Sequence, residues 1–290
     1  MTVPPLQVLP VGDQRVGLYE YGDPQGQPVL TFHGVPASGA GFVFADAPAR
    51  ERGLRILAPD RPGIGRSSAV DGWGIADYPP MVARLADALG VDRFGVLGYS
   101  GGGPYAVAVA ASLTDRVSRV AVAAGMGQIG DWATVDEFEK TDRQMLSLCA
   151  KHPRVARAVL GTTGWLARKS PKIAYGSFLK QLSEADRAVA DRLGSPAEAM
   201  ALFTQAFLEG ARGVVDDYRA IAGKWGVDLD AIEAPVRIFQ GTADTMVPRR
   251  HSEELAERIA GAELTLWPGE GHLGTINHVE EILDWLAAAS

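Results

Sequence analysis

Residues 94–105 read FGVLGYSGGGPY, and the interpretation of the whole 290-residue chain starts from this stretch. An apolar run that ends in Gly-Tyr-Ser-Gly-Gly and continues into alanine- and valine-rich sequence predicts a strand, an abrupt turn and a helix. Ser100 lies at the tip of this turn. The flanking glycines let the backbone bend sharply enough to expose the Ser100 hydroxyl, and the start of the helix supplies unpaired backbone N–H groups. The stretch therefore predicts a serine nucleophile beside a place for a developing negative charge.

The composition is typical of a globular protein with a large apolar core and a small-molecule partner. The chain is 47% hydrophobic, has a formal net charge of −7 and a sequence pI near 5.3. Because an acidic chain has no overall electrostatic footprint for phosphate groups, we expect no nucleic-acid and no membrane partner. The single cysteine, Cys149, cannot form an internal disulfide, which fits a reducing compartment, and we expect a cytoplasmic protein. The sequence specifies no oligomeric state.

Short apolar strands alternate with amphipathic helices along most of the chain. Strands are predicted where apolar runs end in turn signals, and helices where apolar residues recur every three to four positions. Because the strands are apolar on both faces, we expect a mostly parallel sheet flanked by helices. The predicted strands are 16–21, 28–32, 55–58, 94–98, 119–123, 236–240 and 263–267, and the helices between them are 41–52, 75–89, 104–113, 214–222, 251–259 and 279–287.

The alternation of strands and helices stops between Gly127 and Arg212. Apolar residues in this stretch recur at helical spacing, and prolines separate the helical segments. We therefore predict an all-helical cap, or lid, at residues 127–212. It would be inserted between two parts of one core domain, residues 1–126 and residues 213–290.

Three residues with complementary chemistry each come just after a predicted strand. Ser100, Asp244 and His272 occupy these positions, in that order along the chain. Because the carboxyl ends of parallel strands meet at one edge of a sheet, we expect the three side chains to lie in one crevice. Asp228 and Asp230 precede their strand and are therefore expected near the opposite edge.

These motifs resemble those of the α/β-hydrolase superfamily, in a member with a serine nucleophile and an inserted helical cap. The resemblance covers nearly the whole chain and implies the α/β-hydrolase fold, with no cofactor and no metal. It rests on His33-Gly34, DRPGIGRS at residues 60–67, GYSGG at residues 98–102, GTAD at residues 241–244, and Gly271-His272.

The resemblance also implies a catalytic triad and an oxyanion hole. Ser100 attacks a carbonyl carbon, His272 takes the serine proton and passes it to the leaving group, and Asp244 orients the imidazole. In the family, one oxyanion donor is the residue after the nucleophile and the other lies in the loop after the first core strand. These positions hold Gly101 and Val35, whose backbone N–H groups are the expected donors.

Other polar residues are expected to have structural roles. His33 is predicted to orient the oxyanion loop, and Asp60 and Arg61 to fix the turn that follows their strand. His251 falls in a predicted helix and is expected at the surface.

Carboxylic ester hydrolysis, as in the carboxylesterases, is the activity that the resemblance favours, with an apolar acyl or aryl substrate because the predicted cap is rich in apolar residues. Serine at position 100 differs from the aspartate of haloalkane dehalogenases and epoxide hydrolases. The same triad leaves open a lactonase, a carbon–carbon bond hydrolase, an aminopeptidase and a perhydrolase or haloperoxidase-like enzyme. A ligand receptor on the same fold is the alternative from another class.

Overall fold

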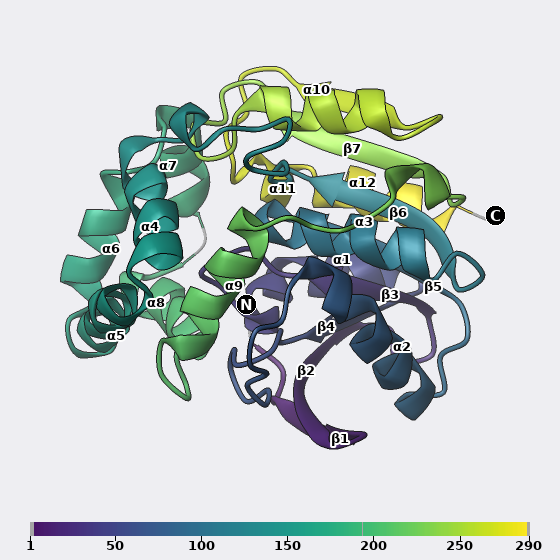
Figure 1. Cartoon of the computed structure of the whole chain (residues 1–290), viewed down its shortest axis with the longest axis horizontal. Helices are drawn as coiled ribbons and strands as arrows, with labels where there is room; N and C mark the ends of the chain where they lie inside the picture. The colour runs from purple at the N-terminus through teal and green to yellow at the C-terminus, as the bar shows by residue number, and fades with distance from the viewer. Residues whose placement is uncertain (1–2, 193, 289–290) are drawn as a thin grey trace.

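The structure, a computed structural model, describes residues 3–192 and 194–288. Its centre is an eight-stranded sheet with helices on both faces (Figure 1). The strand order is β1-β2-β4-β3-β5-β6-β7-β8. β1 and β2 pair antiparallel, as do β2 and β4, and all other neighbouring strands are parallel. The predicted α/β fold with a mostly parallel sheet is confirmed.

The strands lie close to the predicted ranges, with one addition at the N-terminal end. They are β1 (Gln7–Val11), β2 (Gln14–Gly22), β3 (Gln27–Phe32), β4 (Leu54–Pro59), β5 (Phe94–Tyr99), β6 (Val117–Ala123), β7 (Val236–Gly241) and β8 (Glu263–Trp267). β1 is not predicted from the sequence. This strand is at the edge of the sheet, most of its residues are exposed or half-buried, and it contains Pro10, so its apolar pattern is weak.

The helices that cover the sheet also follow the predictions, except for α11, which is not predicted, and three of them are directly preceded by 3-10 turns. The covering helices are α1 (Asp46–Glu51), α2 (Tyr78–Ala88), α3 (Gly103–Ser112), α9 (Arg212–Ala222), α10 (Arg249–Arg258), α11 (Gly274–Asn277) and α12 (Val279–Ala287). The 3-10 turns are η1 (Gly39–Ala45), η2 (Ile75–Asp77), η3 (Ser100–Gly102), η4 (Val135–Glu137) and η5 (Leu229–Ala231).

Alternate residues of the central strands pack on opposite sides of the sheet. In β5, Val96 belongs to a buried cluster with residues of α2 and α3, whereas Leu97 belongs to one with residues of α1 and α12. Both side chains are at most 2% exposed. The sheet is therefore buried on both faces, which is why its strands read as continuous apolar runs in the sequence.

Helices α4 to α8 lie together at one side of the molecule, on the left in Figure 1. They are α4 (Lys140–Lys151), α5 (Pro153–Lys169), α6 (Pro171–Leu179), α7 (Glu184–Ala190) and α8 (Pro196–Gln205), and together they form the helical segment, residues 140–205. α4 and α5 contact α9, and α7 contacts α11. In the described part of the chain, no helix is long and apolar enough to cross a membrane.

Candidate active site

Ser100 lies at the junction between β5 and η3, in a backbone conformation that is rare for a residue with a side chain. Its φ is 55°, in the left-handed region, and its side chain is largely covered, since Ser100 is 8% exposed. The chain packs tightly here: a β carbon on Gly98 would lie 2.6 Å from the carbonyl oxygen of Gly102, and one on Gly102 would collide with that of Phe32. Only glycine permits these approaches, so the two glycines let the turn close against β3.

The loop after β3 lies directly against this turn. A β carbon on Gly34 would be 3.2 Å from Cβ of Ser100, and one on Gly101 would be 2.8 Å from Cγ1 of Val35. The structure therefore brings together Ser100 and the two residues expected to donate to an oxyanion, Val35 and Gly101.

Arg61 fixes the loop after β3 through hydrogen bonds to its backbone. Its guanidinium group donates hydrogen bonds to the carbonyl oxygens of His33 and Gly34, and it pairs with Asp217 of α9 at 2.6 Å. Tyr105 of α3 donates its hydroxyl to Asp217 at 2.7 Å. Arg61 and Asp217 are fully buried. The expectation that Arg61 fixes the turn after its own strand is therefore incomplete, since its side chain also ties the loop after β3 to Asp217 of α9, which Tyr105 of α3 contacts.

His33 and Asp60 are both buried and form hydrogen bonds with backbone groups. Nε2 of His33 accepts the backbone N–H of Arg61 at 3.3 Å, and Nδ1 lies 2.8 Å from the carbonyl oxygen of Gly34. Burial, with the nearby charge of Arg61, holds the pKa of His33 well below its usual value. Asp60 accepts the N–H of Gly39 at 2.8 Å, and burial raises its pKa to about 7. Neither side chain is placed to act as a base on Ser100.

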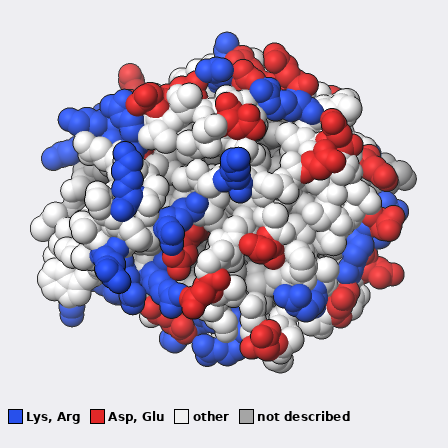
Figure 2. All heavy atoms as spheres, viewed as in Figure 1, with Lys and Arg blue, Asp and Glu red and all other residues white. Residues whose placement is uncertain are grey.

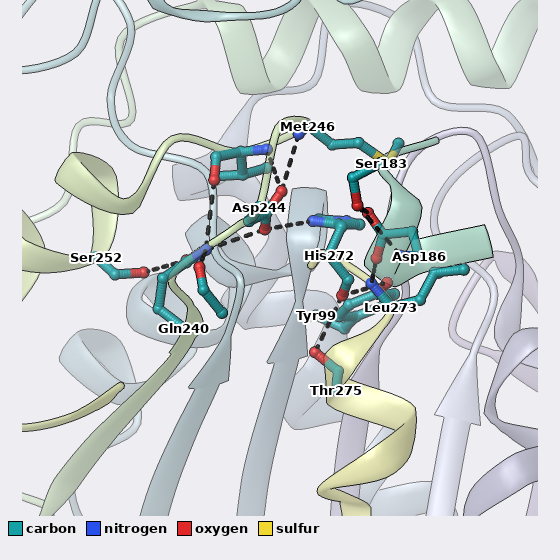
Figure 3. A network of polar contacts seen from close by, with 12 residues as sticks. Tyr99, Ser183, Asp186, Gln240, Asp244, Met246, Ser252, His272, Leu273 and Thr275 are labelled. Carbon is teal, nitrogen blue, oxygen red and sulfur yellow. Dashed lines mark hydrogen bonds and ion pairs between the residues drawn. The ribbon is translucent and has the colours of Figure 1, made fainter. Parts of the chain in front are cut away.

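His272 and Asp244 form a hydrogen-bonded pair at the carboxyl edge of the sheet (Figure 3). Nδ1 of His272 lies 2.8 Å from Oδ2 of Asp244, and both side chains are at most 4% exposed. The other carboxylate oxygen accepts the N–H groups of Met246 and Val247, at 2.8 and 2.9 Å. Gln240 donates to Oδ2 at 3.0 Å. The carboxylate is thus fixed on all sides and in turn fixes the imidazole ring.

The pKa of His272 reflects two opposing effects. Burial lowers it, but the charge of Asp244 and the hydrogen bond between them outweigh burial, so the pKa lies above the usual value. Because Nδ1 faces the carboxylate, the neutral ring carries its lone pair on Nε2. Among the described residues, Nε2 of His272 has no hydrogen-bond partner, Ser100 included. In enzymes without substrate, the hydrogen bond between a nucleophile and its base is often long or poorly aligned.

Tyr99 connects the turn at Ser100 to His272. Its ring centroid lies 5.2 Å from that of His272, and its hydroxyl donates to the carbonyl oxygen of His272 at 3.3 Å. Because Tyr99 directly precedes Ser100, this contact brings the imidazole and the serine to the same part of the sheet edge. Asp142 of α4 also faces this region, where its charge favours protonated His272 and burial raises its own pKa.

Asp186 of α7 reaches from the helical segment to the loop that carries His272 (Figure 3). Its carboxylate accepts the N–H of Leu273 at 2.6 Å and the hydroxyl of Ser183 at 2.7 Å, and the residue is fully buried. A β carbon on Gly271 would collide with this carboxylate. The sequence analysis does not identify Asp186, because Ser183 and Asp186 have the spacing of an ordinary helix cap.

A second histidine–carboxylate pair lies on α10. Nδ1 of His251 accepts the N–H of Gly127 at 3.0 Å, and Nε2 lies 3.2 Å from a carboxylate oxygen of Glu137. His251 is 1% exposed, so the expectation of a surface residue is wrong. The 3-10 turn that ends at Glu137 covers this face of α10, and the ring of Phe138 lies 5.0 Å from the imidazole. Both ring nitrogens are engaged, which leaves no lone pair for catalysis.

Metal-binding clusters are absent from the part of the chain that the structure describes, where no three His, Cys, Asp or Glu residues are arranged to hold an ion. The polar groups at this sheet edge are instead a hydroxyl, an imidazole, carboxylates and backbone amides, which are the groups used in acyl transfer.

Known proteins resemble this chain over nearly its full length. A family model described as the alpha/beta hydrolase fold matches residues 27–279. The chain is 27% identical over 251 residues to the uncharacterized hydrolase YcgS of Bacillus subtilis, with 86% of each protein covered. It is 27% identical over 277 residues to the putative carbamate hydrolase RutD of Caulobacter sp., with 91% of this chain and 92% of that protein covered. A solved hydrolase structure from Pseudomonas aeruginosa has a TM-score of 0.71 at 22% identity, with 98% of both chains covered.

Proposed function

Because this chain belongs to the alpha/beta hydrolase fold family, we propose that it is a serine hydrolase with Ser100 as nucleophile, His272 as general base and Asp244 as the group that orients His272. The observation that carries the proposal is the 2.8 Å hydrogen bond between His272 and Asp244, which leaves the lone pair on Nε2 available to accept the Ser100 proton. Tyr99, which contacts His272 and directly precedes Ser100, supports the same assignment.

The reaction proceeds through an acyl-enzyme. Oγ of Ser100 attacks the substrate carbonyl carbon while Nε2 of His272 takes the hydroxyl proton, and this proton then passes to the departing alcohol. A water molecule repeats these steps on the acyl group and restores Ser100. The N–H groups of Val35 and Gly101 would hold the oxyanion, and loss of one such donor typically costs about 10²–10³ in rate. Arg61 would support this site because it binds the carbonyl oxygens of the oxyanion loop.

The helical segment would serve as a cap, with residues 127–212 as its extent. Ser100 and His272 are at most 8% exposed, so a substrate reaches them only when elements above the site move. A closed site beneath a cap rich in apolar residues favours a small ester of an apolar acid, because burial of apolar surface would drive its binding. The RutD relative, described as a putative carbamate hydrolase, makes carbamates the first alternative substrates to test.

A fluorophosphonate probe followed by mass spectrometry tests the nucleophile. The wild-type protein should carry the probe on Ser100, and the Ser100→Ala variant should remain unmodified. Ser112→Ala, which changes an exposed serine at the end of α3, is the matched control and should label like the wild type. A wild-type protein that does not react, or a Ser100→Ala variant that still reacts, would contradict the proposal.

Substrate class is tested on a panel of esters, lactones, carbamates and aminoacyl amides of graded size. Short apolar esters should give the highest kcat/KM, and Ser100→Ala should abolish turnover of every compound. If the protein reacts with the probe but turns over a lactone or a carbamate faster than any ester, the proposed triad stands and the proposed substrate class is wrong. Probe labelling without turnover of any compound would favour the receptor.

A further inference from the structure

The helical segment carries a strongly basic stretch in an acidic protein. Residues 151–183 contain seven lysines and arginines and no aspartate or glutamate, although the whole chain has a net charge of −7. All seven side chains belong to exposed residues on or beside α5 and α6. They are Lys151, Arg154, Arg157, Arg168, Lys169, Lys172 and Lys180.

These seven cations lack ion-pair partners among the described residues. Basic residues elsewhere are commonly paired; Arg52, for example, bridges Glu280 and Asp284, and Arg258 pairs with Glu254. In Figure 2, blue side chains gather among white surface on the left of the molecule, where the helical segment lies. The charge of this surface is therefore available to an external anion.

The outward face of α5 is apolar as well as basic. Val155 is 53% exposed, Val159 42% and Trp165 55%, and Ile173, in the first turn of α6, is 64% exposed. At about 100° per residue, the first three lie within an arc of about 120° on the side of α5 away from its buried residues. The opposite face of α5 is buried against the rest of the protein through Ala156, Leu160, Gly164 and Ala167. α5 thus presents apolar side chains on both faces, of which only one is covered.

We propose that the outward face of α5 with the start of α6, here called the α5 surface, docks onto an anionic membrane. Exposed valine, isoleucine and tryptophan side chains flanked by arginine and lysine are the composition of helices that lie in the lipid interface. The apolar groups would enter the headgroup boundary while the cations bind lipid phosphate and carboxylate groups. Only side chains enter the bilayer, so the helix lies on the surface and does not span it.

The basic and apolar character of the α5 surface also favours an anionic membrane over a second copy of the chain or a nucleic acid. A second copy of the chain in a two-fold dimer would place the same unpaired cations opposite one another, without acidic residues to balance them. A nucleic acid would satisfy the cations but would leave Val155, Val159 and Ile173 without an apolar partner. A bilayer with anionic lipids supplies both kinds of contact.

The net charge of the whole chain is negative although this surface is basic, which is why no membrane partner is expected from the sequence. At physiological salt, charges more than a Debye length of about 8 Å away are largely screened, so a membrane responds to the local surface and not to the distant acidic residues. The inference does not rest on the proposed catalytic mechanism, since no residue of the α5 surface belongs to the proposed triad.

Sedimentation with lipid vesicles tests the proposal on the full-length protein. We expect binding to vesicles of phosphatidylcholine and phosphatidylglycerol in equal parts, weak binding to phosphatidylcholine alone, and loss of binding at high salt. The triple variant Arg154→Glu, Arg168→Glu and Lys169→Glu should reduce binding at least about tenfold. The matched control, Arg15→Glu, Arg84→Glu and Arg93→Glu, changes the net charge equally at sites outside the helical segment and should bind like the wild type.

Trp165→Ser separates a membrane from other anionic partners because it leaves the charge unchanged. This variant should lose about three- to tenfold in vesicle binding, since a large apolar contact is removed. Circular dichroism of each variant verifies that it is folded. The proposal is overturned if wild-type protein binds both vesicle types equally, if the control triple variant loses as much binding as the test variant, or if Trp165→Ser binds vesicles as tightly as wild type. Tighter binding to duplex DNA or an acidic protein than to the anionic vesicles would also overturn it.

Discussion

Two buried histidines in this protein each lie beside a carboxylate, but the surroundings of the two imidazole rings differ. His272 lies 2.8 Å from Asp244, and His251 lies 3.2 Å from Glu137. Both histidines are at most 3% exposed. The difference is in the second ring nitrogen: that of His251 accepts the N–H of Gly127, whereas that of His272 has no hydrogen-bond partner in the described residues. Burial and an acidic neighbour therefore do not separate the two histidines, but an available lone pair does, and the proposed role of His272 as base depends on it.

The pKa values of the two histidines move in opposite directions. Burial lowers the pKa of His251, and the hydrogen bond and charge of half-exposed Glu137 do not compensate, because Arg250 lies beside the same carboxylate. Burial also acts to lower the pKa of His272, but Asp244 is fully buried and overcomes it. The charges of Asp186 and Asp142 also raise the pKa of His272, whereas the charge of Arg250 acts against Glu137 at His251.

Replacement of each histidine by alanine should give the largest difference in kcat between the two pairs. His272→Ala removes the proposed base, and we expect kcat to fall about 10⁴- to 10⁶-fold. His251→Ala removes hydrogen bonds that support the chain at Gly127 and Glu137, and kcat should stay within about tenfold of the wild type, since no proposed reacting group changes. Steady-state kinetics on the best ester substrate measure both. A loss below tenfold for His272→Ala would assign the base elsewhere.

Asp186 should have an intermediate effect, because it acts through the position and the charge environment of His272. Asp186→Ala leaves the N–H of Leu273 without its acceptor, and we expect kcat to fall about 10- to 100-fold with little change in KM. Asp186→Asn keeps an acceptor oxygen and should recover most of this loss. Both variants remove a charge that raises the pKa of His272, so the acidic limb of kcat/KM should move to lower pH.

If Asp186 only stabilised the fold, its variants would differ in stability and not in the pH dependence of the rate. The alanine and asparagine variants would then lower the melting temperature without moving the acidic limb of the pH profile. Glu184→Ala and Glu184→Gln, at an exposed acidic residue two positions before Asp186 in α7, are the matched controls and should leave both the rate and the pH profile unchanged.

The smallest effect expected is on the pH dependence of stability, where the two histidines should again differ in sign. The pKa of His251 is lowered on folding, so its contribution is present above its unfolded pKa of about 6.5 and is lost as pH falls through the folded value. The pKa of His272 is raised, so its contribution is present below about 6.5 and is lost as pH rises through the folded value. Each shifted pKa unit corresponds to about 1.4 kcal/mol.

Urea unfolding of the wild type and of the two alanine variants across the neutral range measures these contributions. The stability difference between wild type and His272→Ala should become less favourable to the wild type as pH rises. The difference for His251→Ala should change in the opposite direction. Parallel pH dependences for the two variants would contradict the opposite pKa directions.

The sequence predicts the parts of the fold and site that depend on local pattern. The strands follow from short apolar runs, and the positions of Ser100, Asp244 and His272 just beyond them follow from the geometry of a parallel sheet. The contacts of Asp186 with Leu273 and of Arg61 with Asp217 join residues far apart in the sequence, and no local spacing records them. They become evident only when the helices are placed against the sheet.

The burial of His251 and the basic stretch of the helical segment both escape a reading of the sequence, for related reasons. A histidine in a polar helix reads as exposed unless the turn that covers it, here at Glu137, is placed. Likewise, a net charge averages over the chain and hides a basic stretch with no acidic residue between Lys151 and Ser183. Composition over a window, read together with exposure, is the signal that identifies such a surface.

The pH dependence of fluorophosphonate labelling tests the central claim most directly. Over about pH 5–9, the labelling rate of Ser100 should rise with a single ionisation whose pKa lies above the usual histidine value, near 6.5. His251→Ala should show the same curve, and His272→Ala should be slower by about 10³ or more and flat with pH. Labelling at another residue, or a curve that disappears in His251→Ala and persists in His272→Ala, would contradict the account.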